Sequence, residues 1–243
     1  MQKINFRNLF FVYRYKIILM FLIMILGTGR SMAQTKNLEF FDYGKIIHFG
    51  FTIGTNFANF KYDLSQKFYL NDSLNSVSIK RYPGITLGAI ADIHIKEFFD
   101  IRIIPSLVLT QRDINFTFKD GYTITKPIES IFAEVPLLIK YKSTRHGNLR
   151  FYVIGGGKVS YDFASESNVT RDPDKPIIAI DPLNYYYEYG CGLDMYFEWF
   201  KFSPEIKLSK GINNVLAPYN DNFSGSFTRL RSNMIFFSLN FEG

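Results

Sequence analysis

Long segments in which apolar residues alternate with small or polar residues constrain the fold of this chain more than any other feature. From His48 to Phe57 the odd positions carry phenylalanine, isoleucine and threonine, whereas the even positions carry histidine, glycine, threonine and asparagine. A period of two places these two sets on opposite faces of a β-strand. No segment after Ala33 sustains the spacing of three and four that an amphipathic helix requires. The pattern therefore predicts an all-β chain.

Eight segments of this kind follow one another along the chain. Most have about 10 to 15 residues, more than the roughly 5 to 6 usual in soluble sheets and enough for the 9 to 11 of a tilted membrane strand. The predicted strands are 45–58, 84–95, 101–112, 129–142, 149–163, 185–197, 201–210 and 229–241.

The lengths of the connections between these strands alternate. Connections of about 16 to 25 residues are followed by connections of about 3 to 6, so the long ones lie at one end of the barrel and the short ones at the other. Short periplasmic turns, long external loops and an even strand count are typical of outer-membrane barrels. We therefore expect a closed antiparallel up-and-down transmembrane β-barrel of eight strands in the bacterial outer membrane.

The two faces of the predicted strands differ in charge. A soluble barrel would direct its apolar face inward, but here the face opposite the aliphatic one carries the charged residues, so we expect the aliphatic face to contact lipid. Eight strands enclose a space that side chains just fill, so the charged groups are expected to interlock and to leave no diffusion pore. The expected lumen charge network is His48, Asp92, His94, Arg102, Glu134, Lys140, Lys158, Glu188, Asp194, Glu205 and Lys207.

Aromatic residues cluster where the predicted strands meet the connections. Such clusters resemble the two aromatic girdles that flank the apolar band of a membrane barrel. The expected membrane-interface aromatics are Phe98, Phe99, Tyr185, Tyr186, Tyr187, Tyr189, Trp199 and Phe200.

Three prolines, Pro105, Pro136 and Pro204, lie inside predicted strands. Proline lacks the N–H that a ladder needs, and a closed barrel has no edge strand on which to place it. We therefore expect local breaks in strand pairing, or bulges, at these positions.

The first 33 residues have the composition of a cleaved signal peptide. A basic region is followed by the apolar run 17–26, and Ser31-Met32-Ala33 offers small residues for cleavage before Gln34. We expect 34–44 to be a periplasmic segment and 45–243 to be the barrel. Five of the 28 basic residues lie in the leader, which leaves 23 against 22 acidic residues, so there is no basic stripe that would bind nucleic acid.

Few residues offer reactive chemistry. Cys191 is the one cysteine, so no internal disulfide can form, and three histidines in the chain give no metal-site spacing. Asp92, His94 and Ser106 could form a hydrolytic triad, but they are expected to face the lumen, away from a lipid substrate. The run 155–157 followed by lysine lacks the phosphate-loop spacing and fits a glycine-rich strand better. We expect no cofactor and no small-molecule substrate.

Several segments resemble one family. EVPLLIKYKS (134–143), IHFGFTIGTN (47–56), FSPEIKLSKGINN (202–214) and RSNMIFFSLNFEG (231–243) are similar to the PorT family of outer-membrane barrels from Bacteroidota. This resemblance implies an accessory role in type IX protein secretion and, in gliding species, in motility. It implies outer-membrane lipid and other secretion-machinery proteins as partners, and no catalytic motif.

Three functional hypotheses follow. The first is a non-enzymatic secretion component that docks other proteins. The second is a structural or adhesive barrel that binds an external ligand through its long loops. The third is a lipid-modifying enzyme that would depend on His94 and Ser106.

Overall fold

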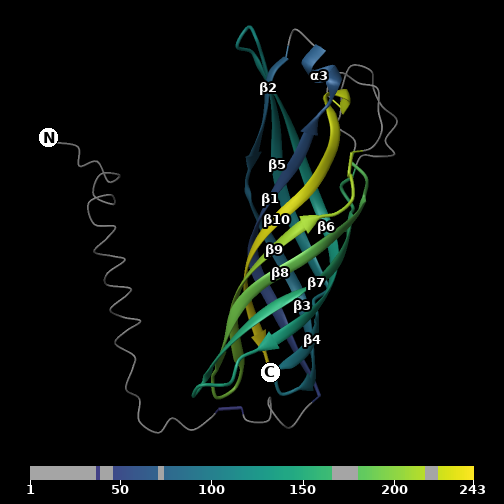
Figure 1. The fold of residues 1–243 in the computed structure, drawn as a ribbon. Coiled ribbons are helices and arrows are strands. Elements are labelled where there is room, and N and C mark those ends of the chain that lie inside the picture. Colours follow the sequence, from purple (N-terminus) through teal and green to yellow (C-terminus); the bar gives the residue numbers. More distant parts are fainter. Residues whose placement is uncertain (1–36, 39–45, 71–73, 166–179, 217–223) are drawn as a thin grey trace, which may run out of the picture. The chain divides into compact units, whose positions relative to one another are not determined.

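The computed structural model describes residues 37–38, 46–70, 74–165, 180–216 and 224–243. Within these ranges the chain is almost entirely β-strand (Figure 1). A short helix, α3 (Gln66–Leu70), and a 3-10 turn, η1 (Ser224–Ser226), also occur, and no described helix is long and apolar enough to cross a membrane. The strands are β1 (Ile47–Leu64), β2 (Leu74–Arg81), β3 (Pro83–Lys96), β4 (Phe99–Ile103), β5 (Ser106–Phe118), β6 (Thr123–Lys142), β7 (Leu149–Asp162), β8 (Leu183–Tyr196), β9 (Lys201–Gly211) and β10 (Phe227–Glu242).

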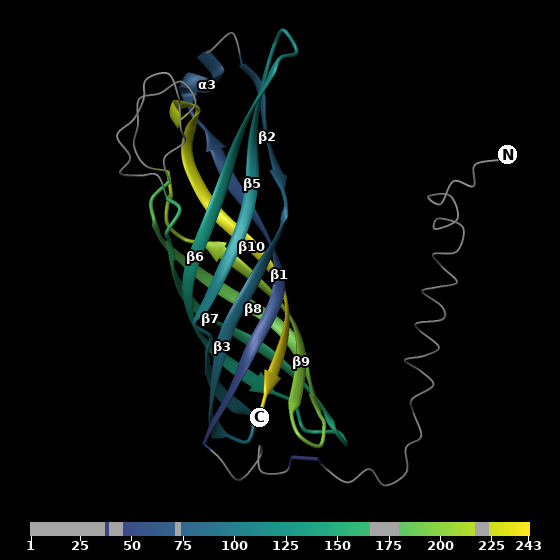
Figure 2. The ribbon, with the colours of Figure 1, turned by 180° about the vertical axis from the view of Figure 1, so that it is seen from behind.

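Neighbouring strands are antiparallel, and the sheet closes on itself. β1 pairs with β10 on one side and with β3 on the other. β4 and β5 both lie between β3 and β6, so they are two parts of one strand of the ring, and β2 and β3 are two parts of another. Counted in this way, the described strands form a closed antiparallel barrel of eight, as predicted (Figures 1 and 2).

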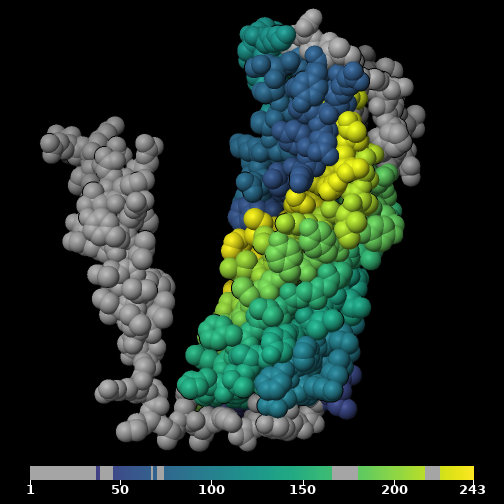
Figure 3. Space-filling model, in the orientation of Figure 1, coloured from purple at the N-terminus to yellow at the C-terminus, as the bar shows by residue number. Residues whose placement is uncertain are grey.

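The alternation in sequence becomes an alternation in burial. In β6 the side chains of Val135, Leu137 and Ile139 are 53%, 57% and 59% exposed on the outer wall, whereas Glu134 and Lys140 are buried in the lumen. Figure 3 shows one face of this wall, on which side chains of adjacent strands lie against one another. An aliphatic band of this extent is suited to lipid, because in water it would aggregate.

The strand prolines coincide with breaks in the ladder, as predicted. Ile104 and Pro105 separate β4 from β5, and Pro136 faces the same break, where its carbonyl oxygen accepts the N–H of Ile104 at 3.4 Å. The ladder between β8 and β9 lacks the pairs beside Pro204. The register is the same on both sides of each break, so the prolines remove hydrogen bonds without forming bulges.

At the long-loop end the strands continue beyond the predicted apolar band. The prediction of a long connection over 113–128 is wrong, because β5 and β6 extend through most of this range. A tight turn over 119–122 joins them. Phe118 donates its N–H to the carbonyl of Tyr122 at 2.8 Å, and Gly121 has a φ of 86°, which glycine adopts without strain. β2 likewise forms inside the first long connection. These extensions alternate with a period of two, but their apolar residues, such as Ile114 and Phe116, are buried inside the barrel rather than exposed on the wall. A search for strands with an apolar outer face therefore misses them.

An apolar cluster fills the barrel at the same end. Its side chains come from β1, β2, β5 and β10, from α3 and from the connections at Ile180 and Val215, so they pack inside the barrel there. The buried members are Phe60, Phe68, Leu74, Val77, Ile114, Phe116, Ile180, Val215, Phe227 and Leu230.

The predicted leader 1–33 lies outside the described residues, as does most of the segment 34–44. Asn37 is described, and it lies at the short-turn end, where its N–H donates to Oδ1 of Asn148 at 3.0 Å. Its side-chain amide donates to the carbonyl of Tyr196 at 3.3 Å, and Arg145, stacked 3.8 Å from the Tyr196 ring centroid, donates to the Asn37 carbonyl. The chain therefore contacts the short-turn end before β1 begins.

Candidate functional site

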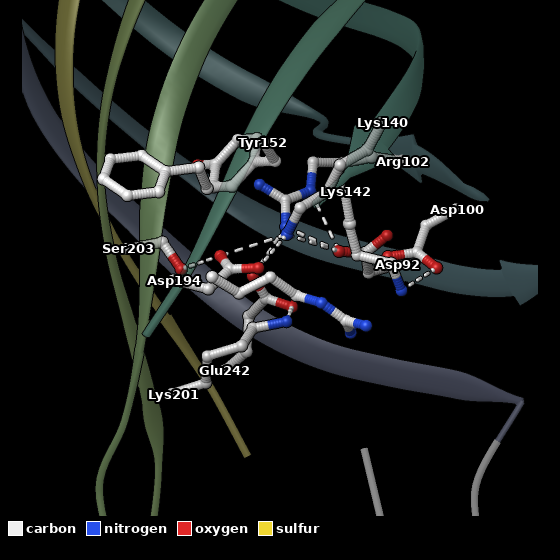
Figure 4. Close-up of polar contacts among 12 residues, drawn as sticks. Asp92, Asp100, Arg102, Lys140, Lys142, Tyr152, Asp194, Lys201, Ser203 and Glu242 are labelled. Carbon is white, nitrogen blue, oxygen red and sulfur yellow. Dashed lines mark hydrogen bonds and ion pairs between the residues drawn. The ribbon is translucent and has the colours of Figure 1, made fainter. Parts of the chain in front are cut away.

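The densest polar constellation in the described chain is an ion-pair network in the half of the lumen nearest the short turns (Figure 4). Its centre is Arg102 of β4, which is fully buried. Nη2 donates to Asp92 Oδ2 at 2.5 Å and to Glu242 Oε1 at 2.7 Å, and Nη1 donates to Glu205 Oε2 at 3.2 Å. One guanidinium therefore joins β3, β4, β9 and β10 across the lumen.

Lys140 of β6 extends this network to the other side of the ring. Its Nζ lies 2.8 Å from Asp194 Oδ2 on β8 and 4.0 Å from the centroid of the Tyr152 ring. The Tyr152 hydroxyl donates to Glu205 Oε2 at 2.8 Å, and Ser203 donates to Asp194 at 2.6 Å. A buried charge is costly unless it is paired and hydrogen-bonded, and here each acid lies against a cation.

A second group lies at the short-turn mouth of the lumen. Lys142 Nζ is 2.6 Å from Asp100 Oδ1, and His94 Nδ1 is 2.8 Å from the same oxygen. His94 keeps 18% of its side-chain surface exposed, whereas His48 on the neighbouring strand is buried. Lys201 binds Glu242 Oε2 at 2.7 Å and links the mouth to the Arg102 network.

A third group lies further toward the long loops. Lys158 of β7 binds Glu134 of β6 at 2.8 Å and Glu188 of β8 at 3.0 Å. Its Nζ also donates to Ser209 Oγ at 3.1 Å and lies 4.6 Å from the ring centroid of Phe236. This cation is therefore surrounded on three sides by its partners.

Apolar layers separate these ionic layers. Tyr152, Leu138, Ile104, Ile90 and Ile154 form one buried cluster. Another lies toward the long loops and consists of Ala58, Val108, Phe132, Tyr186, Met234 and Phe236. Together with the apolar cluster at the outer end, these layers place buried side chains along the described lumen from one end to the other.

The structure brings the sequence-predicted lumen residues together. Ten of the eleven are buried, and the other, His94, is partly exposed at the mouth. Lys207, the last of the set, lies 3.4 Å from Glu205. Some opposite charges lie on adjacent strands, as Lys158 does with Glu134 and Glu188, whereas others, such as Lys140 and Asp194, pair across the lumen. Both arrangements pair the charges of a confined interior.

Sequence reasoning missed several members of the network. Asp100 and Glu242 lie one position outside the predicted strands 101–112 and 229–241, whereas Lys142 and Lys201 are terminal residues of the predicted strands 129–142 and 201–210. Arg112 is also buried, with its guanidinium 3.7 Å from the Phe60 ring centroid and bonded to Ser232 Oγ at 2.8 Å. The period of two could have found them, because each has the same phase as the lumen residues in its strand.

The predicted interface aromatics lie mostly on the outer wall. Phe99, Tyr185, Tyr187, Tyr189, Trp199 and Phe200 are exposed, and Phe98 is partly buried. Tyr186 was assigned to the interface wrongly. It is 1% exposed, and Lys158 Nζ lies 4.6 Å from its ring centroid, because a strand directs Tyr186 inward when Tyr185 and Tyr187 point outward.

The hydrolytic alternative is not assembled in the described chain. Asp92 binds Arg102 rather than His94, and His94 binds Asp100. Ser106 pairs with Gly88 across the β3–β5 ladder. Likewise, no group of three or more His, Cys, Asp or Glu among the described residues could hold a metal ion.

The glycine run 155–157 lies in β7, not in a phosphate loop. A Cβ atom at Gly156 would lie 2.1 Å from the carbonyl oxygen of Leu137, so close backbone approach explains the residue. Cys191 is free and exposed on the outer wall, where it is a small apolar residue.

The chain is similar in sequence or in structure to several known proteins. The sequence profile of the family described as "Outer membrane protein beta-barrel domain" matches residues 32–217. No curated protein matches the chain. Among solved structures, the outer membrane protein OprG from Pseudomonas aeruginosa is 10% identical over 81% of this chain and 94% of that chain, with a TM-score of 0.45. The N-terminal β-barrel domain of Pseudomonas aeruginosa OprF is 12% identical over 78% and 96%, with a TM-score of 0.33. The enduracididine biosynthesis enzyme MppR aligns at 9% identity over 87% and 95%, with a TM-score of 0.18.

Proposed function

Because this chain belongs to the family of outer membrane protein β-barrel domains, we propose that it is a non-enzymatic barrel of the bacterial outer membrane that supports type IX protein secretion. In gliding species the same role would support motility. The barrel acts by docking other proteins of the outer membrane or periplasm, and its lumen does not carry cargo.

The filled lumen is the observation that supports a docking role over a transport role. Arg102, Lys140 and Lys158 are each bound to buried carboxylates, and apolar layers lie between them. Opening a pore would separate these ion pairs in a confined space, at a cost of several kcal/mol for each uncompensated charge. The wall and the two ends then remain as the surfaces on which the barrel can act.

The secretion role itself is supported by the resemblance of 134–143 and 202–214 to PorT. These segments lie in β6 and β9 and place Glu134, Lys140 and Glu205 in the lumen network. The resemblance therefore includes lumen positions as well as the apolar wall that many barrels share.

A deletion strain tests the proposal. Loss of type IX cargo from the medium, with the same cargo retained in the periplasm, is the expected result, and a plasmid copy should restore export. A second strain carries Arg229→Met, an exposed position outside the network, as a control for the plasmid protein. Normal export of C-terminal-domain cargo without the gene would overturn the secretion role while leaving the barrel unaffected.

One observation favours the second hypothesis, an external ligand. At the long-loop end Tyr69 of α3 and Tyr122 of the β5–β6 turn are 73% and 64% exposed on folded structure that extends past the apolar band. Loss of cell attachment in a Tyr69→Ser, Tyr122→Ser strain with intact cargo export would support adhesion. Unchanged attachment would exclude these two residues as its basis.

A further inference from the structure

The barrel wall carries an open seam at its long-loop end. The ladder between β1 and β3 ends at the pair Phe57 and Pro83. Beyond it, β1 continues to Leu64 paired only with β10, and β2 is paired only with β5. Figure 2 shows β2 beside β5 in this region. No ladder pair joins β1 to β2 in the described chain, so two strand edges face each other without being paired.

Alternation of the hydrogen bonds identifies the groups on the β1 edge. Along an antiparallel strand, successive residues direct their N–H and C=O to opposite neighbours. The carbonyl of Ile46 accepts from His94 on the β3 side, whereas the carbonyl of Phe49 accepts from Gly243 on the β10 side. The backbone N–H and C=O of even-numbered residues of β1 therefore point toward the β3 side. Beyond Phe57 the backbone groups of Ala58, Phe60 and Tyr62 consequently point toward the seam.

The β2 edge follows from the same rule. The N–H of Tyr82 donates to the carbonyl of Gln111 on β5 at 3.3 Å, so the backbone N–H and C=O of even-numbered residues of β2 point toward β5. The backbone groups of Val77, Ile79 and Arg81 then face β1. The Tyr62 hydroxyl donates to the Val77 carbonyl at 2.7 Å, which places that carbonyl on the seam independently. We call these six residues, three from each strand, the outer seam.

The seam has an apolar floor and a basic rim. Phe60 and Val77 are buried in the apolar cluster below it, and Ile79 packs against the same cluster. Lys61, Lys80 and Arg81 are exposed beside it, and two acids lie nearby, the exposed Asp63 and the buried Asp113, which is opposite Lys80 in the β2–β5 ladder. Like charges on edge strands oppose pairing between copies of the same chain. The same cations attract acidic side chains.

We propose that the outer seam binds an extended β-strand of a partner protein in which apolar residues alternate with acidic ones. Apart from the Val77 carbonyl, which accepts from the Tyr62 hydroxyl, the backbone donors and acceptors of the outer seam form an unpaired row. The backbone of another strand matches such a row, which is the usual mode of β-strand addition. Apolar side chains of the incoming strand would cover Phe60 and Ile79, and its acids would face Lys61 and Lys80. This inference does not depend on the secretion role.

Amide hydrogen exchange tests the premise in the purified full-length barrel in detergent micelles. The N–H groups of Phe60, Tyr62 and Ile79 should exchange fast, whereas those of Lys61 and Ser78, which face the ladders, should be protected. Protection of both sets in the free protein would mean that the seam is closed and would overturn the proposal.

Binding is then measured with a fluorescent peptide of alternating valine and glutamate that has the same length as β2, eight residues. A control peptide has the same side chains but N-methylated backbone amides, which cannot donate hydrogen bonds to a strand edge. We expect the N-methylated peptide to bind at least about tenfold more weakly, a difference of roughly 1.4 kcal/mol. Equal binding of the two peptides, or no binding of either, would overturn strand addition.

A matched pair of variants locates the site. Ile79→Pro removes one N–H that faces the seam and keeps the hydrogen bonds to β5, whereas Ile79→Ala removes the same side chain and keeps the N–H. Binding should fall about tenfold further in Ile79→Pro than in Ile79→Ala. Equal peptide affinities of the two variants would place the peptide at another site. If the barrel formed dimers that Ile79→Pro abolished, the occupant of the seam would be a second copy of this chain.

Discussion

At the scale of single residues, the lumen of this barrel is organised by three buried cations. Arg102, Lys140 and Lys158 each bind two or more carboxylates, and Arg102 and Lys140 reach strands that are not adjacent to their own. Arg102 is suited to the central place because its planar guanidinium donates to several carboxylates at once. Removing Arg102 would leave its acids with one cation fewer, because Lys140 still lies 3.7 Å from Asp92 and Lys201 lies 2.7 Å from Glu242.

Arg102→Met tests this arrangement. The substitution keeps most of the side-chain volume but leaves Asp92 and Glu242 without their main partner, so we expect the free energy of unfolding to fall by roughly 3 to 5 kcal/mol. Urea unfolding followed by the heat-modifiable gel mobility of the barrel measures it. Arg229→Met, at an exposed position, should change stability by less than about 0.5 kcal/mol. Equal stability of the two variants would show that the lumen network contributes little.

The glycine run of β7 gives a second residue-scale prediction. A Cβ at Gly156 would lie 2.1 Å from a backbone oxygen, whereas at Gly155 the nearest atom lies at 3.8 Å. Gly156→Ala should therefore destabilise the barrel by about 1 to 3 kcal/mol. Gly155→Ala should be neutral, or stabilising by up to about 1 kcal/mol, because it restricts the unfolded chain. The same urea titration compares them, and a reversed order would contradict the close approach at Gly156.

At the scale of elements, the short turns carry the aromatic residues that position the barrel in the bilayer. Trp199 lies in the β8–β9 turn with 85% of its surface exposed, and Phe197 stacks on Phe200 beside it at 5.0 Å. Tryptophan favours the headgroup region because its ring is amphipathic. We therefore place this turn at the periplasmic interface of the membrane.

Trp199 is the one tryptophan of the chain, so its fluorescence reports this position alone. In vesicles, lipids brominated near the headgroup should quench it more than lipids brominated near the chain end. A Trp199→Phe, Leu137→Trp variant moves the probe to the middle of the outer wall and should reverse the order. If lipids brominated near the chain end quenched Trp199 more strongly than the tryptophan at position 137, the interface assignment would be contradicted.

At the scale of the whole barrel, closure and filling go together. An eight-stranded ring has room for side chains only, and the ionic and apolar layers occupy it. Closure also removes sheet edges within the apolar band, and among the described residues unpaired edges remain in the extensions past it, on β1 beyond Phe57, on β2 and on β6 before Phe132. The barrel therefore presents its wall, its turns and its outer seam to other molecules.

A filled lumen predicts an absence of conductance. The purified barrel, inserted into a planar lipid bilayer, should give no stable current steps at neutral pH, because no continuous water path crosses the layers. Heat-modifiable mobility of the same preparation serves as the control for folding. Reproducible steps of one size would show an open lumen and would remove the main support for a docking role.

The sequence by itself determined the eight membrane strands, the orientation of their faces and most of the lumen charges. It could do so because a strand repeats every two residues, and a single apolar band fixes which phase faces lipid. Glu134, Lys140 and Lys158 could therefore be placed in the lumen from their positions alone.

Tertiary structure alone decided what lies beyond that band. Which acid binds Arg102 depends on how four strands meet across the lumen, and no spacing along the chain encodes it. The extension of β5 and β6 and the separation of β2 from β1 likewise depend on strand pairing and packing. Hydrogen bonds between backbones are nearly independent of side-chain type, so their extent becomes visible only when the strands are brought together.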